Sequence, residues 1–404
     1  MIFRRFSRTR TTRVGRSLSL LFGTLLVAAS LAACSSSKTA TSSATTSATT
    51  AASNAAGTSA TTAAGSTSSG LAQAESIVAK YSSQPTQITD TAKITKAIPK
   101  GKTIYFIPCG PNPECQQEGQ LVKQATDVIG WNTVIVPNDG TPQGNKAAFD
   151  QVVRAKPVAV LYTAIPQSDF QSEIAALKAN NTAVIACCVT DPTGNGVDYN
   201  IDSPQQSAPV GQAQGAWVAA DSKCQNADSV VINIPDFAIL ADGVKAFQSE
   251  LTSACPSAQA NVLDIALANL STANTTIVSY LRAHPTVRYV VASTDGVTIG
   301  LPAALKAAGL ANIKIVGQGA TPTNIQYLHS GQQAVDVAFP YGEVMWAMVT
   351  AAIQHAVGDP ITPAVAPPLW ILTPQNAPNT SASIFPVVNN YQAQYEALWG
   401  VSNG

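Results

Sequence analysis

Thr103-Ile-Tyr-Phe-Ile107 is the first of a series of short apolar runs that are rich in β-branched residues. Pro, Gly, Asn or Asp bounds each run, which is typical of buried strands. The first four runs start 30, 25 and 25 residues apart, and residues at helical spacing follow at least two of them. The further runs are 133–136, 158–162 and 183–185, then 230–234, 262–265, 289–292, 313–316 and 335–337.

The rhythm of these runs predicts the fold class. Strands that alternate with helices at this period form parallel sheets through right-handed crossovers. Uninterrupted apolar runs indicate strands that are covered on both faces. The two series therefore predict an α/β protein with two doubly wound parallel-sheet lobes and a ligand cleft between them. Ligands of open α/β sheets bind beyond the carboxyl ends of the strands, so the candidate site residues directly follow the runs.

The N-terminus has the pattern of an export signal. Six arginines and no acid precede an apolar stretch of about 14 residues, which is shorter than the ~20 that a membrane-spanning helix needs. We therefore expect a signal peptide over residues 1–33. Leu31-Ala-Ala-Cys34 resembles the lipobox of bacterial lipoproteins, which implies a lipid on Cys34; the alternative is an ordinary signal peptide with a nearby cysteine. Residues 34–70 are almost entirely Ser, Thr, Ala and Gly, and predict a disordered tether.

Charge outside the signal argues against nucleic acid as a partner. The chain has 404 residues with 23 basic and 23 acidic side chains, and removal of residues 1–33 leaves 17 basic against 23 acidic groups. A mildly acidic body does not attract a polyanion. No sequence motif of a hydrolase, a metalloprotease or a phosphate-binding loop occurs either, so we expect no enzyme activity and no cofactor.

Six cysteines remain in the body, and outside the cell membrane an even number favours disulfides. Cys224 and Cys255 are the favoured pair, because one precedes a strand and the other ends the next helix. Cys109 and Cys115 would close a short loop, although Cys187 or Cys188 is an alternative partner for that loop. Free buried thiols remain a further alternative. The spacing does not favour zinc, so no metal site is predicted.

Several segments together resemble a known family. Gly101 to Cys109 followed by Asn112-Pro113, Ser293-Thr-Asp-Gly296, Val316-Gly317 before Gln318, and Gly342 after Phe339-Pro340 are similar to the type I periplasmic binding proteins of sugar-type ABC transporters. The similarity extends over about residues 100–373. It implies three chain crossovers between the lobes, near 202–204, 339–341 and 367–369.

The resemblance also implies a division of the chain. A lead-in segment would cover 71–100, and a C-terminal extension would cover 375–404. The N-terminal lobe would comprise 101–203 plus 339–367. The C-terminal lobe would comprise 204–338 plus 368–374.

Ten residues are candidates for ligand binding, from the strand ends and from the resemblance. The family's paired aromatics are replaced by Glu114-Cys115 and its arginine after 230–234 is absent, which argues for a smaller or more apolar ligand than a pentose or hexose. Alternative roles exist for several of the candidates. Turn formation or helix capping is the alternative for Asp191, Asp236 and Asp295. Packing at the hinge is the alternative for Phe339 and Tyr341. Glu114 is either an exposed surface charge or a residue that binds a cationic or hydroxylated ligand. The candidates are Asn112, Glu114, Thr163, Asp191, Asp236, Asn269, Asp295, Gln318, Phe339 and Tyr341.

These features predict a monomeric solute-binding lipoprotein on the outer face of the cell membrane. Its lobes would close on a small organic solute, sugar-like or polyol-like by resemblance, and deliver it to an ABC permease driven by an ATPase. The alternative is a sensory lipoprotein that presents its closed form to a membrane receptor. A hydrolase on the same scaffold is a third hypothesis without positive support.

Overall fold

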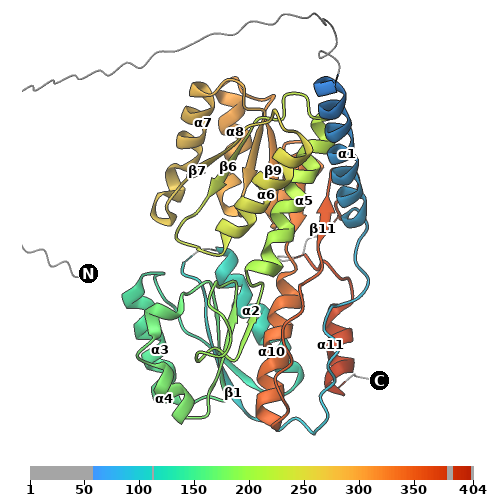
Figure 1. The fold of residues 1–404 in the computed structure, drawn as a ribbon. Coiled ribbons are helices and arrows are strands. Elements are labelled where there is room, and N and C mark those ends of the chain that lie inside the picture. Colours follow the sequence, from blue (N-terminus) through green and yellow to red (C-terminus); the bar gives the residue numbers. More distant parts are fainter. Residues whose placement is uncertain (1–57, 112, 380–384, 402–404) are drawn as a thin grey trace, which may run out of the picture. The chain divides into compact units, whose positions relative to one another are not determined.

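Two sheets organise the part of the chain that the computed structural model describes, residues 58–111, 113–379 and 385–401 (Figure 1). The first sheet has the strand order β2-β1-β3-β4-β5, and all its pairs are parallel. Every residue of β3 and β4 is buried, as the continuous apolar runs predict. Its strands are β1 (Thr103–Ile107), β2 (Asn132–Ile135), β3 (Ala159–Thr163), β4 (Ala183–Cys187) and β5 (Tyr199–Ile201).

The second sheet has the order β11-β10-β9-β8-β6-β7. Its pairs are parallel except for β11, which runs antiparallel to β10. This strand returns to the second sheet after the chain has packed a helix against the first. The strands are β6 (Ser229–Asn233), β7 (Ala260–Asp264), β8 (Tyr289–Ala292), β9 (Lys314–Gly319), β10 (Val335–Ala338) and β11 (Trp370–Leu372).

Helices cover both faces of each sheet, so the predicted doubly wound class is confirmed. We call the first sheet with its helices the first lobe. It contains α2 (Pro113–Val128), α3 (Pro142–Ala155), η1 (Gln167–Phe170), α4 (Ile174–Ala179) and α10 (Tyr341–Val357). The second lobe contains α5 (Pro204–Ser222), α6 (Leu240–Ala254), η2 (Leu267–Thr272), α7 (Ala273–Ala283), η3 (Asp295–Thr298), α8 (Leu301–Ala307) and α9 (Pro322–His329).

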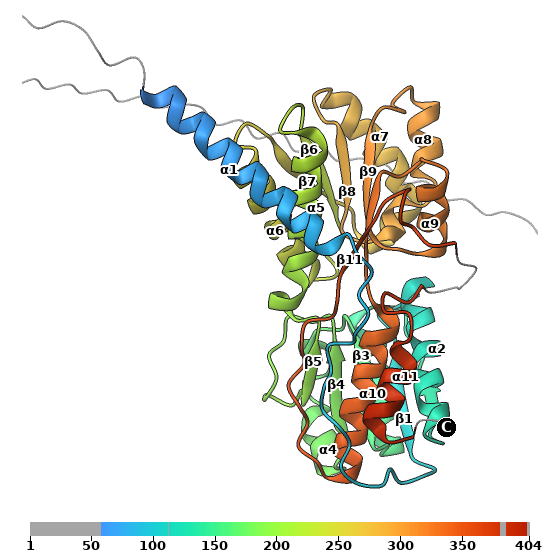
Figure 2. The ribbon, with the colours of Figure 1, turned by 90° about the vertical axis from the view of Figure 1, so that its right-hand side faces the viewer.

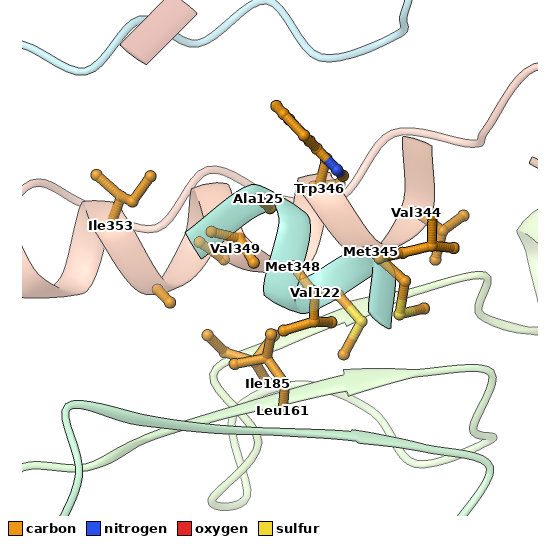
Figure 3. Packing of buried hydrophobic residues seen from close by; sticks show 14 of the residues in the cluster. Val122, Ala125, Leu161, Ile185, Val344, Met345, Trp346, Met348, Val349 and Ile353 are labelled. Carbon is orange, nitrogen blue, oxygen red and sulfur yellow. The ribbon is translucent and has the colours of Figure 1, made fainter. Parts of the chain in front are cut away.

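The core of the first lobe lies between its sheet and helices α2 and α10. Figure 3 shows Met348 of α10 and Val122 of α2 directed toward Leu161 and Ile185 of the sheet. Trp346 leaves α10 on another side and stacks on Trp399, with ring centroids 5.0 Å apart. Helix α10 is thus buried nearly all round, which fixes the position of its N-terminal Tyr341.

The chain passes between the sheets in three connections of the hinge. They lie between β5 and α5, between β10 and α10, and between α10 and β11. A capping box at Ser203 starts α5, since its side chain and that of Gln206 satisfy each other's backbone N–H groups. Asp202 lies immediately before this cap, with a left-handed φ of 57°.

The terminal segments correct one predicted boundary. The expected tether over 34–70 overlaps helix α1 (Thr58–Tyr81), which begins well before residue 71. Leu71 and Ile77 of α1 pack on the core of the second lobe, and this packing supports a helix that composition alone does not predict. Figure 2 shows α1 beside α5 and α6. The predicted signal peptide and Cys34 lie outside the described residues.

Two short strands are absent from the predicted series, β5 and β11, each of three residues. The C-terminal segment also joins the fold, because α11 (Tyr391–Trp399) packs beside α10 on the first lobe (Figure 2). Phe385 and Val387, which precede it, instead pack on the second lobe. The chain therefore makes a further passage between the lobes within the segment expected to be an extension.

The six body cysteines are all paired in the structure. Cys224 is bonded to Cys255, and Cys109 to Cys115. Cys187 and Cys188 are bonded to each other, so neither supplies the alternative partner for the 109–115 loop. The hypothesis of free buried thiols does not apply to these residues.

Candidate ligand-binding site

A cavity lies at the carboxyl ends of the strands, where the two lobes face each other. We call it the interlobe cavity. Parallel strands of both sheets end here, so loops of both lobes supply side chains, as expected for an open α/β sheet. The lining residues are Cys109, Glu114, Cys115, Glu118, Thr163, Ala164, Cys188, Asp202, Phe237, Ile239, Leu240, Ser293, Thr294, Gln318, Phe339 and Tyr341.

The interlobe cavity has the size of a small-molecule site. Its accessible volume is about 90 Å³, and it is partly open to solvent. It can therefore hold several water molecules or a small organic solute.

Glu114 connects the two lobes across the cavity. It lies in the first turn of α2 and accepts hydrogen bonds from the Thr294 hydroxyl, at 2.9 Å, and the Tyr341 hydroxyl, at 3.2 Å. Thr294 follows β8 of the second lobe, and Tyr341 follows the second hinge connection. Burial raises the pKa of Glu114 to about 7, and the nearby charge of Asp295 adds to this shift.

Glu118 is one helical turn beyond Glu114 on the same face of α2. Its side chain is only 4% exposed, and one carboxylate oxygen accepts a hydrogen bond of 2.8 Å from the Thr163 hydroxyl at the end of β3. Burial raises the pKa of Glu118 to about 8, and the charge of Glu114 contributes in the same direction. Without a ligand, Glu118 therefore retains a proton to a higher pH than an ordinary glutamate.

Asp202 brings a third carboxyl to the cavity from the first hinge connection. It is 6% exposed, and its Oδ1 has no hydrogen-bond partner among the residues that the structure describes. Burial alone raises the pKa of Asp202 to about 7. A buried polar atom without a partner costs about 1–3 kcal/mol, so a ligand that supplies a donor gains affinity here.

Aromatic and aliphatic groups form the other side of the cavity. The rings of Phe339 and Tyr341 meet edge to face with centroids 4.8 Å apart. Phe237 and Leu240, just after β6, add apolar surface from the second lobe. The Cys109–Cys115 disulfide holds the loop after β1 against the start of α2. The cavity therefore combines an acidic side with an apolar side, a common composition for small-molecule sites.

A second group of carboxyls lies in the second lobe and does not line the cavity. Asp295 accepts hydrogen bonds from the backbone N–H groups of Gln318 and Thr321, at 3.1 and 2.9 Å. Asp336 accepts from the backbone of Ala320 and the side chain of Gln333, at 3.0 and 2.6 Å. The two carboxyls also share a hydrogen bond, and burial raises the pKa of both. We call them the carboxyl pair.

Gly317 explains how β9 passes over the carboxyl pair. A Cβ at this position would overlap the side chains of Gln333 and Asp336, and would come within 2.8 Å of Asp295. Only glycine permits this close approach. The pair thus fixes the path of the chain up to Gln318, which lines the cavity.

The structure brings together half of the ten predicted site residues. Glu114, Thr163, Gln318, Phe339 and Tyr341 line the interlobe cavity. Four others lie outside its lining. Asp191 accepts a hydrogen bond from the backbone N–H of Gln167, and Asp236 accepts one from the backbone N–H of Leu267. Asn269 is exposed in η2, and Asp295 belongs to the carboxyl pair. Asn112 lies outside the described residues.

Two acidic cavity residues were not among the sequence candidates. Glu118 lies inside a helix rather than at a strand end, and its signal was the spacing of four residues from Glu114. Asp202 belongs to the first predicted crossover, where its signal was an acid next to Ser203-Pro204. The hinge itself therefore supplies a ligand-facing group.

The described residues contain neither a metal-site cluster nor a membrane-spanning helix. No group of three or more His, Cys, Asp or Glu side chains among them has the arrangement of a metal site. None of the helices in the described ranges is both long enough and apolar enough to cross a membrane.

Solved structures show the same fold at low sequence identity. A solute-binding protein of an ABC transporter from Burkholderia graminis, in complex with D-arabinose, has a TM-score of 0.63 and 11% identity over 72% of this chain and 100% of its own. One from Bacillus halodurans with bound myo-inositol has a TM-score of 0.61 and 14% identity over 70% and 98%. One from Agrobacterium vitis with bound allitol has a TM-score of 0.61 and 16% identity over 69% and 97%.

Sequence comparison leads to the same group. No curated protein matches the chain. The family described as the periplasmic binding protein domain matches residues 104–360, which is more than half of the chain. With two doubly wound lobes and a cavity where their strands end, this chain belongs to the periplasmic binding protein family.

Proposed function

We propose that this protein is an extracytoplasmic, lipid-anchored solute-binding protein. It captures a small hydroxylated solute between its lobes and delivers it to an ABC permease and its ATPase, without chemical change to the solute. The observation that carries this proposal is the interlobe cavity with Glu114 at its centre. Because this carboxyl accepts hydrogen bonds from Thr294 and from Tyr341 of the hinge, closure and ligand enclosure are one event.

The class of solute follows from the side chains and from the relatives. Carboxyl, hydroxyl and amide groups in the cavity suit a ligand with several hydroxyls, and the rings of Phe339 and Tyr341 suit its carbon skeleton. The related structures hold D-arabinose, myo-inositol and allitol, which are sugars or polyols.

A thermal-shift experiment tests solute capture. The full chain is mixed with the low-mass fraction of a cell extract, and a ligand at 100 times its dissociation constant adds about 2.7 kcal/mol of stability. We expect stabilisation, and its loss in Phe339→Ala, which removes a cavity wall. The matched control is Phe149→Leu in the first-lobe core, which lowers stability without changing the shift. An extract that stabilises neither wild type nor control contradicts the proposal.

Membrane attachment through Cys34 has a separate test. Cells that express the full chain are labelled with a radioactive fatty acid and separated into membrane and soluble fractions. We expect the wild-type protein to carry the label and to be found in the membrane fraction. The Cys34→Ala variant should carry no label. Equal labelling of wild type and variant would exclude Cys34 as the site.

A further inference from the structure

In the part of the chain that the structure describes, the lining of the interlobe cavity offers no positive charge to Glu118 or Asp202. None of the described lining residues is Lys, Arg or His. Among the described residues, no basic side chain forms an ion pair with Glu118 or Asp202; the acids that do form ion pairs lie elsewhere, at Asp127, Asp150, Glu173, Asp221, Asp242 and Asp359. Burying a carboxylate without compensation is strongly unfavourable. The missing counter-charge is therefore a property that the ligand can supply.

Asp202 points to the same conclusion independently. Asp202 lines the cavity, and its Oδ1 is buried without a protein donor in the described chain. Glu118 accepts from Thr163 through one oxygen only, so its carboxylate has further acceptor capacity. An ammonium group offers three donors and one positive charge, whereas a hydroxyl offers one donor and no charge.

The apolar side of the cavity suits a cation as well. The faces of aromatic rings attract a positive charge within about 6 Å, and this attraction is larger when the cation is desolvated. Phe237, Phe339 and Tyr341 all belong to the lining. A neutral sugar would use the same rings for stacking, so it is the carboxyls that discriminate between the two kinds of solute.

We propose that the captured solute carries a cationic nitrogen, bound by the carboxylates of Glu118 and Asp202, in addition to its hydroxyls. The solute class is thus a small hydroxylated amine rather than a neutral sugar or polyol. This inference rests on the proposed function, because it names the ligand of the same cavity. Glu114, which already accepts from Thr294 and Tyr341, orients the hydroxylated part and keeps the lobes together.

Protonation supplies a second consequence of the proposal. The groups that face Glu118 are Glu114 on its own helix, Thr163 on β3, and Tyr341 on α10, with Asp295 of η3 nearby. All of these are acidic or neutral, and burial raises the pKa of Glu118 to about 8. A cation that ionises Glu118 displaces its proton, so binding at pH 7 releases about one proton. A neutral solute releases none.

The test uses the full chain and a cell extract separated into two parts by cation exchange. The probes are the retained, cationic low-mass fraction and the neutral and anionic flow-through. Thermal shift measures stabilisation by each part, and calorimetry in buffers of different ionisation enthalpy measures proton release. We expect stabilisation by the retained fraction only, with proton release at pH 7. Stabilisation by the flow-through alone overturns this inference but leaves the proposed function standing, whereas no stabilisation by either part overturns both.

Variants connect the result to the two carboxyls. Glu118→Gln and Asp202→Asn keep the shape of each side chain and remove its charge. We expect each to weaken binding of the stabilising component of the retained fraction roughly 10- to 100-fold, the usual effect of losing a charged hydrogen bond. The control is Asp127→Asn, an exposed acid at the other end of α2, which leaves binding unchanged. Equal affinities in wild type and both cavity variants overturn the assignment, and a second probe pair, serinol against glycerol, checks the preference for an amine directly.

Discussion

The two most buried cavity carboxyls, Glu118 and Asp202, resemble the carboxyl pair in their low exposure but differ in the number of hydrogen-bond donors around them. Asp295 and Asp336 are fully buried and accept backbone and amide N–H groups, so the fold uses their hydrogen-bonding capacity. Glu118 accepts from one hydroxyl, and Asp202 has an oxygen without a partner in the described chain. Burial by itself therefore does not distinguish a structural acid from a ligand-binding acid. The number of protein hydrogen-bond donors around the carboxyl group does.

The difference also has an energetic meaning. The carboxyl pair stabilises the second lobe in the absence of any ligand, because its removal leaves buried N–H groups without acceptors. The cavity carboxyls cost stability when they ionise in an empty site. Substitutions at four positions test this contrast.

The largest effect concerns the pH dependence of stability. Glu118 has a pKa of about 8 in the folded protein against an ordinary value near 4.5, so between these values the folded state binds more protons than the unfolded state. Its contribution is therefore present at low pH and lost as pH rises toward 8. From pH 5 to 8, wild type should lose about 4 kcal/mol more unfolding free energy than Glu118→Gln. Urea unfolding without ligand measures both, and parallel pH profiles would contradict the assignment.

Replacement of one member of the carboxyl pair should give the next largest effect. Asp336→Ala leaves the Ala320 N–H and the Gln333 amide without acceptors, and should lower the free energy of unfolding by about 3 kcal/mol. Asp336→Asn keeps an acceptor and should cost less. Urea unfolding measures both variants. If Asp336→Ala cost under about 1 kcal/mol, the pair would not have the structural role assigned to it.

The sequence predicts the sheets well because their strands are buried on both faces. Residues 103–107 and 289–292 are strands with the same bounds in the structure, and each is an unbroken apolar run. Residues 199–201 and 370–372 were missed, because three residues carry no period, and their pairing depends on neighbouring strands that come from elsewhere in the chain. Helix α1 was missed over its first turns because their Ser, Thr, Ala and Gly composition gives no helical pattern, while Leu71 and Ile77 further along the helix pack on the second lobe.

The site was half predictable for a related reason. Thr163 and Gln318 directly follow buried strand residues, and topology alone brings such positions to one edge. Asp236 and Asn269 also follow strands, but the loops after β6 and β7 turn them toward backbone groups or solvent. The course of a loop depends on tertiary contacts that have no local pattern. Asp202 could not be predicted as a site residue from the sequence, because nothing local indicates that the hinge lines the cavity.

A smaller effect is expected at the hydrogen bond that joins the lobes. Thr294→Val removes the hydroxyl that donates to Glu114, so the closed form loses about 1 kcal/mol. Affinity for the solute recovered from the extract should fall about fivefold, because the hydrogen bond forms only on closure, and the unfolding free energy of the ligand-free protein should fall by no more than about 1 kcal/mol. Thr294→Ser restores the donor and should restore affinity. Calorimetry and urea unfolding measure the two quantities, and a loss of stability without a loss of affinity would place Thr294 with the structural group.

The smallest effect is expected at an acid that was a candidate on sequence grounds and lies outside the cavity. Asp236 is exposed and accepts the Leu267 N–H at 2.8 Å, so Asp236→Asn keeps an acceptor and should change the unfolding free energy by about 0.5 kcal/mol or less. Affinity for the same solute should stay at the wild-type value. A tenfold loss in Asp236→Asn would mean that long-range attraction by exposed acids, rather than direct contact with the buried carboxyls, determines the preference for a cation. Repeating the titration at high salt separates the two, because exposed charges are screened over about 10 Å and buried ones far less.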